Sequence, residues 1–422
     1  MFSNINKKAY DTYTFTLENS HVTWANTLRR IMLTGVETVA FRTSAEGRGT
    51  GEIASDVTVQ KNDTPMTNQT LAHRVGLLPL HVSEPLKWIS ENYTFHLNVT
   101  NTSDKNIDVV AGDFEVYKKG ADGEDVRIDS TEIFKPNPIT RDTSLIAVLK
   151  PRSIGSKSTT GESIQLTAKA TIGTGREHAA FIPVSRCSYV YTRDNNAERI
   201  KQQFEKWLVN HKKIVPAVLD EPENEAKKGA YEREFNSMEI SRVYKINDSG
   251  NPVSFDFTVR TVGVLEVPYI VRRACEIAEA MCSRYINVDS GPLPDEVTMS
   301  PADSRVIGFD IIFRGHDHTL GNMLQTWLVE NHVDGTAEPR ITYAGYKVPH
   351  PLRDEMLLRI GVEDGKQATA LAALAAAAKG CVQLWRNYKR AWNDATGTAA
   401  PVIAPPPPTK PRTLRIVKTP KA

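Results

Sequence analysis

Cysteine is scarce in this sequence. The 422 residues contain four, Cys187, Cys275, Cys282 and Cys381, and no two of them form a CxxC pair. Such spacings cannot build a zinc ribbon or zinc finger, and so large a chain does not depend on a disulfide framework. We therefore expect reduced, mostly buried thiols in an intracellular protein.

Long apolar runs and an excess of charge of one sign are also missing. The net charge is +2, which provides no overall electrostatic footprint for binding bulk DNA or RNA. The first residues, MFSNINKKAYDTYTF, contain no apolar run typical of a signal peptide. No stretch approaches the ~20 apolar residues that cross a bilayer. The longest, TALAALAAAAKG, is mostly alanine and predicts a helix, so we expect no contact with a membrane.

Catalytic motifs are absent from the chain. It contains no GxSxG elbow, no HExxH and no Asp-x-Asp-x-Asp cluster that could hold catalytic magnesium ions. The segment IGTGREH, residues 172–178, carries a GxG but lacks the third glycine of a dinucleotide site and the lysine of a P-loop. It predicts a tight turn with positive φ at Gly173 or Gly175.

Two segments at opposite ends of the chain share one pattern. DTYTFTLENSHVTWANTLRRIML (11–33) and IGFDIIFRGHDHTLGNMLQTWLV (307–329) each read as an alternating strand, a turn and an amphipathic helix. Asn19 or Ser20 is the expected cap of the first helix. An alignment without gaps pairs Thr23 with Thr319, Asn26 with Asn322, Leu28 with Leu324 and Ala25 with Gly321. The shared register predicts an internal repeat.

The repeat extends into a second strand and helix. PVSFDFTVRTVGVLEVPYIVRRACEIAEAMC (252–282) predicts a strand and a helix. RITYAGYKVPHPLRDEMLLRIGVE (340–363) predicts two strands, followed by a helix over about 367–392. Each half is therefore an α+β unit, and the two can pack about a pseudo-two-fold axis as an isologous dimer does. The first unit comprises residues 1–42 and 241–297, and the second comprises 298–395.

The range 43–240 interrupts the first unit and is expected to be a β-rich insert domain, because short strand patterns and turns fill it. Within it, 196–213 predicts a helix and 220–234 a charged connector. Residues 396–422 are Pro-rich; from Pro401 on they carry five basic residues and no acidic one, which predicts a disordered arm. Its charge could contact nucleic acid or an acidic partner, but a solubilising tail is the simpler interpretation.

The sequence HDH, His316 to His318, allows two interpretations. Two histidines on a turn can supply two metal ligands, but no other His or Glu pair stands at a recognisable ligand spacing. The favoured interpretation is that Asp317 or His316 caps the following helix. LAHRVGLLPLHV (71–82) predicts a turn that docks an apolar strip. The pair Arg29 and Arg30 suits either a solvated helix face or an ion-paired partner surface.

These stretches resemble one family. ANTLRRIML, LAHRVGLLPL and GESIQLTAKATIGTGREHAAFIPVS resemble the third-largest subunit of eukaryotic RNA polymerase II, the archaeal D subunit and, more distantly, the N-terminal region of the bacterial alpha subunit. HDHTLGNMLQTWL and YAGYKVPHPLRDEMLLRI are similar to the eleventh subunit and archaeal subunit L. The resemblance spans about Tyr13 to Ile360. Two normally separate subunits are thus fused, which resembles polymerases of large cytoplasmic DNA viruses.

The resemblance implies a non-catalytic platform on which the largest and second-largest polymerase subunits assemble. It also implies small subunits resembling the tenth and twelfth, no separate dimer partner and only indirect contact with DNA. No metal or cofactor is implied here, because the cysteine cluster of some family members is missing; magnesium belongs to the catalytic subunits. The implied location is infected-cell cytoplasm and virion if the chain is viral, and otherwise the nucleus.

The resemblance also implies two sets of site residues. The first lies in the dimerisation helices and the adjoining platform surface: Asn26, Leu28, Arg29, Arg30, Thr319, Leu320, Gly321 and Asn322. The second shapes the insert domain where it meets the second-largest subunit: His73, Arg74, Gly76, Pro79, Gly175 and His178. Two other classes stay open from the residues alone, a nucleic-acid-binding protein using the basic tail and a metalloenzyme using HDH.

Overall fold

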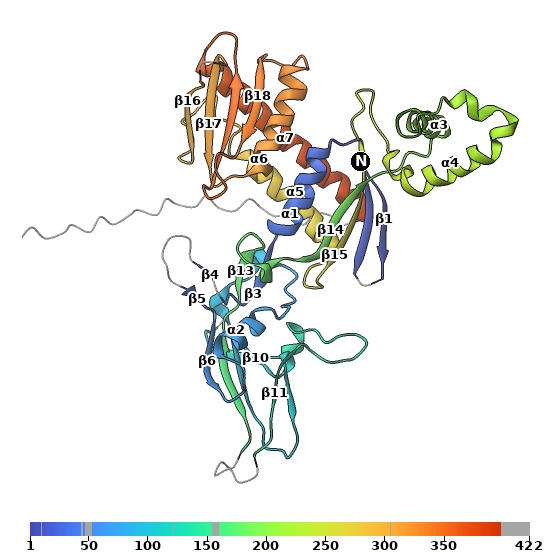
Figure 1. Ribbon diagram of the computed structural model, residues 1–422. Helices are drawn as coiled ribbons and strands as arrows, with labels where there is room; N and C mark the ends of the chain where they lie inside the picture. The colour runs from blue at the N-terminus through green and yellow to red at the C-terminus, as the bar shows by residue number, and fades with distance from the viewer. Residues whose placement is uncertain are drawn as a thin grey trace, which may run out of the picture.

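The computed structural model describes residues 1–9, 11–43, 45–46, 53–120, 122–153, 160–303 and 305–397. Two four-stranded antiparallel sheets lie on either side of a group of long helices, and a β-rich domain and a helical hairpin project from them (Figure 1). The arm was predicted over 396–422: Thr396 and Gly397 end a helix, and residues 398–422 lie outside the described residues.

The first sheet has the order β1-β2-β15-β14 and the second has the order β16-β17-β19-β18. The strands of the first are β1 (Phe2–Lys8), β2 (Thr12–Glu18), β15 (Ser254–Thr261) and β14 (Val184–Tyr191). Those of the second are β16 (Val297–Pro301), β17 (Gly308–Arg314), β19 (Glu355–Gly361) and β18 (Tyr343–Lys347). The aligned positions 15 and 311 hold equivalent places: Phe15 pairs with Phe257 on β15, and Ile311 with Leu358 on β19.

Each sheet is accompanied by two helices. They are α1 (Val22–Thr34) and α5 (Val267–Ser283) in the first unit, and α6 (His318–Leu328) and α7 (Gln367–Thr396) in the second. α5 lies along α7, and α1 contacts both α5 and α6. The buried faces of all four helices and of both sheets belong to one hydrophobic core, so neither unit has a core of its own.

The length and composition of α7 differ from the expectation. The helix runs four residues past Trp392, and its 18-residue window with mean hydropathy 1.3 would be apolar enough to cross a bilayer. Half of that window is buried inside the protein. The stripe that includes Leu374, Ala378 and Trp385 packs in the shared core, which accounts for the apolar composition without a membrane.

The structure divides the range 43–240 into three parts, so the expectation of one β-rich insert is wrong. Residues up to about 183 form a β-rich domain, but β14 pairs with β15 and belongs to the first sheet. The following residues form a helical hairpin of α3 (Ala197–Trp207) and α4 (Glu225–Met238), so the expected charged connector is mainly a helix. β14 has the same strand pattern as its neighbours, and only its pairing partner reveals its sheet.

The β-rich domain contains a five-stranded sheet of order β10-β9-β7-β12-β6. Its strands are β6 (Val57–Asn62), β7 (Tyr93–Thr100), β9 (Glu115–Lys119), β10 (Asp125–Ile128) and β12 (Ser163–Ala168). Three two-stranded pairs accompany it: β3 (Glu37–Ala40) with β13 (Thr171–Thr174), β4 (Ala45–Glu46) with β5 (Ile53–Ala54), and β8 (Ile107–Val110) with β11 (Leu145–Leu149). The domain and the hairpin each have a separate hydrophobic core.

The first half of the stretch LAHRVGLLPLHV, expected to be a turn, is helical. Its first six residues complete α2 (Asn68–Gly76), whose cap Thr67 accepts a hydrogen bond from Thr70 N. Leu71 and Val75 lie on the buried side of α2. Pro79 comes three residues after the helix, where its missing N–H interrupts no helical hydrogen bond.

Candidate interface between the two units

Two contacts between α1 and α6 both use the same pair of aligned positions. The hydroxyls of Thr23 and Thr326 are 2.9 Å apart and buried. On the other side, Arg30 Nε donates to Thr319 Oγ1 at 3.0 Å. Thr319 is the aligned counterpart of Thr23, and Thr326 is the counterpart of Arg30. Each unit therefore contributes the same two positions with the roles exchanged, which is the contact pattern of an isologous interface.

A second reciprocal contact involves two tyrosines. Tyr388 of α7 shares a hydrogen bond of 2.8 Å with Ser20 Oγ, just before α1. Tyr285, just after α5, shares one of 2.8 Å with His316 Nε2, just before α6. Ser20 and His316 are aligned positions, so the long helix of each unit, or the turn that follows it, fixes the start of the other unit's shorter helix.

Burial determines the protonation states of the tyrosine and histidine side chains in this second contact. It raises the pKa of both tyrosine hydroxyls, which stay protonated and able to donate. Burial also lowers the pKa of the His316 imidazole, assisted by the positive charge of Arg284. A neutral imidazole nitrogen can accept the hydrogen bond from Tyr285, so both shifts favour the same arrangement.

The two aligned caps differ in charge. His21 Nδ1 accepts from Thr23 N at 3.2 Å, so His21 is the cap of α1 and the expectation of Asn19 or Ser20 is wrong. Asp317 caps α6 and accepts from Thr319 N at 2.8 Å. Burial opposes ionisation of Asp317, but the hydrogen bonds from Thr319 and the charge of Arg30, 3.2 Å away, outweigh it and lower the pKa.

The two histidines of HDH have different neighbours. His316 is bonded to Tyr285, whereas His318 lies edge-on to the ring of Tyr346 at 5.8 Å. Within the described part of the chain, no three His, Cys, Asp or Glu side chains are grouped so that they could hold a metal ion.

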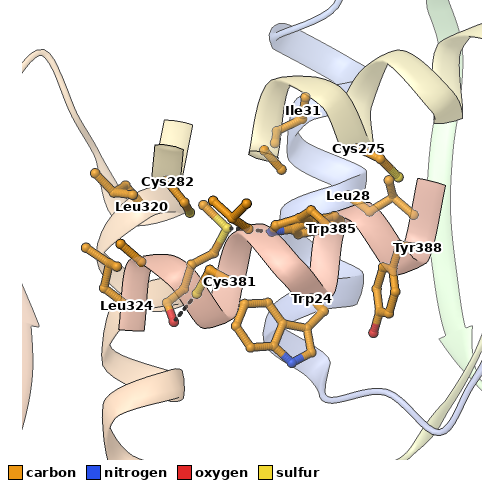
Figure 2. Close-up of a cluster of buried hydrophobic side chains, with 14 of the residues drawn as sticks. Trp24, Leu28, Ile31, Cys275, Cys282, Leu320, Leu324, Cys381, Trp385 and Tyr388 are labelled. Carbon is orange, nitrogen blue, oxygen red and sulfur yellow. Dashed lines mark hydrogen bonds between the residues drawn. The ribbon is translucent and has the colours of Figure 1, made fainter. Parts of the chain in front are cut away.

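Aromatic and sulfur-containing side chains fill the centre of the interface (Figure 2). Trp385 of α7 donates its Nε1–H to Met323 Sδ of α6 at 3.3 Å, and its ring lies 6.3 Å from that of Trp24. All four cysteines are buried and free. Burial raises the pKa of Cys187 to about 12, so its thiol stays protonated and unreactive.

The residues predicted for the dimerisation helices lie at or near this contact. Leu28, Leu320 and Gly321 are buried, and Asn322 donates to Thr23 Oγ1 at 3.2 Å. A side chain at position 321 would collide with the ring of Tyr346, so α6 can approach β18 only with glycine there.

Asn26 and Arg29, from the same predicted set, interact with each other. The Arg29 guanidinium donates to Asn26 Oδ1 at 3.1 and 2.9 Å along one face of α1. Both side chains stay partly accessible, whereas Arg30 reaches across to α6. The two adjacent arginines therefore make different contacts: Arg29 bonds within α1, and Arg30 bonds to α6. The sequence alone does not distinguish them.

The residues predicted for the insert domain come from two separate elements. His73, Arg74 and Gly76 lie on α2, where Arg74 Nε donates to Ile146 O at 2.7 Å and thus ties α2 to β11. Gly76 packs against Thr43, because a Cβ would lie 2.6 Å from its Cγ2. Half-buried Pro79 follows α2.

Gly175 and His178 lie instead in the turn after β13. A Cβ on Gly175 would lie 2.7 Å from Leu33 O at the end of α1, and His178 Nδ1 accepts from Ala180 N at 3.1 Å. The predicted positive φ at Gly173 or Gly175 is wrong. Close packing requires glycine at both, since a Cβ on Gly173 would lie 2.7 Å from the Phe181 ring.

Ionic contacts that tie the second unit to the rest of the chain escape sequence reasoning. Arg176 Nη2 donates to Asp354 Oδ1 at 2.8 Å, which joins the turn after β13 to the second unit. Glu279 of α5 accepts from Arg386 Nε at 2.7 Å and from Lys389 Nζ at 3.1 Å on α7. The partners are more than 100 residues apart, and nothing in the local pattern relates them.

Two α+β units that meet through reciprocal helix contacts define a dimerisation fold, and comparison with known proteins agrees. Residues 14–282 match a family described as "RNA polymerase Rpb3/Rpb11 dimerisation domain". Residues 309–390 match a second family with the same description. Because the first match covers more than half of the chain, the chain belongs to this family, that of the alpha-like subunits of RNA polymerase.

Similar proteins come from archaea and eukaryotes. The chain is 25% identical over 287 residues to "DNA-directed RNA polymerase subunit Rpo3" of Pyrococcus horikoshii, a match covering 67% of this chain and 95% of the relative. It is 29% identical over 196 residues to "DNA-directed RNA polymerases I and III subunit RPAC1" of Saccharomyces cerevisiae, covering 42% of this chain and 52% of the relative.

Proposed function

We propose that this chain is a non-catalytic assembly subunit of a multisubunit DNA-directed RNA polymerase. Its two units pair within one chain as an intrachain pseudo-dimer, and the pair forms the platform on which the two largest subunits assemble. The observation that carries the proposal is the coincidence of two dimerisation-domain matches in one chain with contacts that repeat reciprocally between them.

Fusion gives the pairing a physical advantage. Association of two separate subunits loses translational and rotational freedom, whereas linked units meet at a high effective concentration and in a fixed one-to-one ratio. The single core formed by α1, α5, α6 and α7 supports this reading, because exposing either half would uncover the indole of Trp385 and the side chains of Leu28 and Leu324.

The proposed partners are the largest and second-largest subunits, with small subunits resembling the tenth and twelfth. α2, with His73 and Arg74, and the turn bearing His178 are proposed to face the second-largest subunit. The catalytic residues and their magnesium are proposed to lie on the partners. A viral origin, with location in infected-cell cytoplasm and virion, follows only from the fused arrangement; a nuclear location is the alternative.

Co-production with the second-largest subunit tests the assembly role. We expect a one-to-one complex that survives size-exclusion chromatography, measured by native mass spectrometry. The matched variant changes Arg29 to Glu on the partly accessible face of α1, where it should weaken partner recovery without unfolding the chain. Two folded subunits that elute separately at micromolar concentration would refute the platform role.

A further inference from the structure

One corner of the interface is filled by the chain's own turn. Arg176 N donates to Thr34 O at the end of α1 at 3.0 Å, and the Arg176 side chain is bonded to Asp354 at 2.8 Å. Gly175 lies against the same end of α1. We name this the closed corner: the end of α1, the β17–α6 turn and Asp354, which directly precedes β19 and accepts from Gly315 N at 2.7 Å.

The opposite corner is built from the counterparts of these elements. They are the end of α6, the β2–α1 turn and Val253, which directly precedes β15. Val253 O accepts from Ser20 N at 3.1 Å, much as Asp354 O accepts from Gly315 N. Asn19 and Gly315 are aligned and both have positive φ, 52° and 77°. The backbone therefore has similar features at both corners.

This opposite corner, the open corner, is a pocket of about 480 Å³. The β2–α1 turn, Val253, the end of α6 and one face of α7 line it. Trp24 and Tyr388 are buried among the lining residues, whereas the Gln383 side chain is exposed. The chain thus fills one corner with a loop of its insert domain, and its described residues leave the equivalent surface hollow.

The charge of the open corner indicates what it would accept. Among the described lining residues, Glu330 is the only carboxylate and neither lysine nor arginine occurs, although Met1 and His21 also line the pocket. Its side chain is 48% exposed and lies 4.0 Å from His21 Nε2. Glu330 is the aligned counterpart of Thr34, whose main-chain carbonyl accepts the Arg176 N–H at the closed corner. At the open corner the corresponding residue also carries a side-chain carboxylate, which places a negative charge there.

We propose that the open corner docks a turn of a partner polypeptide that presents an arginine or lysine to Glu330 and a small residue to the end of α6. A cation beside Glu330 forms a charge-assisted hydrogen bond, and a small residue allows the backbone to approach, as Gly175 does at the closed corner. The proposal deepens the assembly function and rests on it, because the partner would be another polymerase subunit.

Site-specific photo-cross-linking in the assembled complex tests the proposal. A photoreactive benzoylphenylalanine replaces Gln383 in the full chain, co-produced with the largest and second-largest subunits. We expect a cross-link to a partner segment containing arginine or lysine, mapped by mass spectrometry. Glu330→Lys should lower its yield about tenfold, the effect of ~1.4 kcal/mol in binding. Asp394→Lys, a charge change further along α7 and outside the pocket, should leave the yield unchanged.

Three results would overturn the proposal: cross-links confined to this chain, its residues 401–422 included; a partner segment without a basic residue; or a yield indifferent to Glu330→Lys. Failure of the complex to form is a separate result that refutes the assembly function itself.

A second measurement uses the chain alone. A fluorescent peptide with the sequence of the closed-corner turn, GTGREHAAFI (173–182), serves as the probe. We expect saturable binding by anisotropy, weakened about tenfold by Glu330→Lys or by an Arg176→Glu peptide, because both place like charges together. Absence of saturable binding, or equal binding by the wild-type chain and Glu330→Lys, would contradict the proposal even if no complex can be assembled.

Discussion

The two units share one architecture but differ in what their loops carry. In the second unit, short segments, 329–342 and 348–354, connect α6 to β18 and β18 to β19. In the first, the corresponding connections carry the β-rich domain between α1 and β14 and the helical hairpin between β14 and β15. Both additions enter at loops and have separate cores, so they leave the shared sheet order and helix contacts intact.

The second unit, which lacks these additions, has the longer of the two equivalent helices. α7 has 30 residues and α5 has 17, and the additional turns of α7 extend over the first unit's sheet. Trp392, in these turns, lies 5.1 Å from the ring of Phe2 and 4.9 Å from that of Phe15 and donates to Pro268 O. The uninterrupted unit thus covers part of the interrupted one, which makes the pairing asymmetric in detail.

Removing the Trp392 side chain from the end of α7 should have the largest effect on stability. Trp392→Ala removes a fully buried indole and leaves a cavity beside Phe15, so we expect a loss of about 3–5 kcal/mol in the free energy of unfolding, measured by urea denaturation. Met238→Ala, at an exposed site on α4, is the matched control and should change it by less than ~0.5 kcal/mol. Similar losses for the two variants would show that α7 does not hold the units together.

Two glycine-to-alanine substitutions compare the stability of the shared core with that of the added helical hairpin. Gly380→Ala in α7 would drive its Cβ into the indole of Trp327, so despite the better helix propensity of alanine we expect a net loss of about 1–3 kcal/mol. Gly229→Ala in α4 meets only the end of Arg233 at 3.6 Å and should stabilise by about 0.5–1 kcal/mol. Thermal unfolding measures both, and equal signs would contradict this distinction.

The two helix caps allow a finer comparison of the units. Asp317→Ala loses a charged cap and the contact with Arg30, so we expect a cost of about 1–2 kcal/mol. His21→Ala loses a longer hydrogen bond and should cost less, about 0.5–1 kcal/mol. Chemical denaturation of the two variants at pH 7 measures the difference, and a larger cost at His21 would invert the comparison.

The smallest effect concerns pH. The pKa of His316 is lowered in the folded protein, so its contribution is complete above the ordinary histidine pKa of about 6.5 and is lost as pH falls below it. We expect the wild-type urea midpoint to drop between pH 7.5 and 5.5, and His316→Gln to flatten part of that drop.

His81 is the internal comparison for this pH dependence. Burial also lowers its pKa, but it lies in the insert domain, where it contacts Ile133 O. His81→Gln should therefore flatten the drop reported by the insert domain and leave the interface unaffected. A pH dependence unchanged by His316→Gln would exclude the Tyr285–His316 contact as its source.

The local sequence pattern was sufficient to predict the repeated strands and helices, but not how the intervening segments pair with them. The alternation Phe309, Ile311, Phe313 and the aligned Thr23 and Thr319 predict strands and helices that the structure contains, because the periods of the apolar side chains differ between the two element types. Sequence reasoning assigned the residues of β14 to the β-rich insert and not to the first sheet, because strand pairing depends on residues about 70 positions away.

Some site residues are likewise predictable from the local sequence, and others are not. The Asp317 cap and the buried Leu28 follow from residues within one turn of helix. The bond from Tyr388 to Ser20 spans 368 positions, and the ion pair from Arg176 to Asp354 spans 178. Neither partner carries a local signature, since an isolated tyrosine or arginine fits many surface and core environments.

The sequence by itself determined two α+β units in one register, their separation by an insertion and the absence of the usual catalytic motifs. These depend on periodicity and motif spacing, which are local properties of the chain. Only the tertiary structure decided that the four helices share one core, that Arg176 fills one corner and that the corner beside Glu330 stays open. Those features arise where distant segments meet, and the physics of packing and charge acts there on distances in space rather than on separation along the chain.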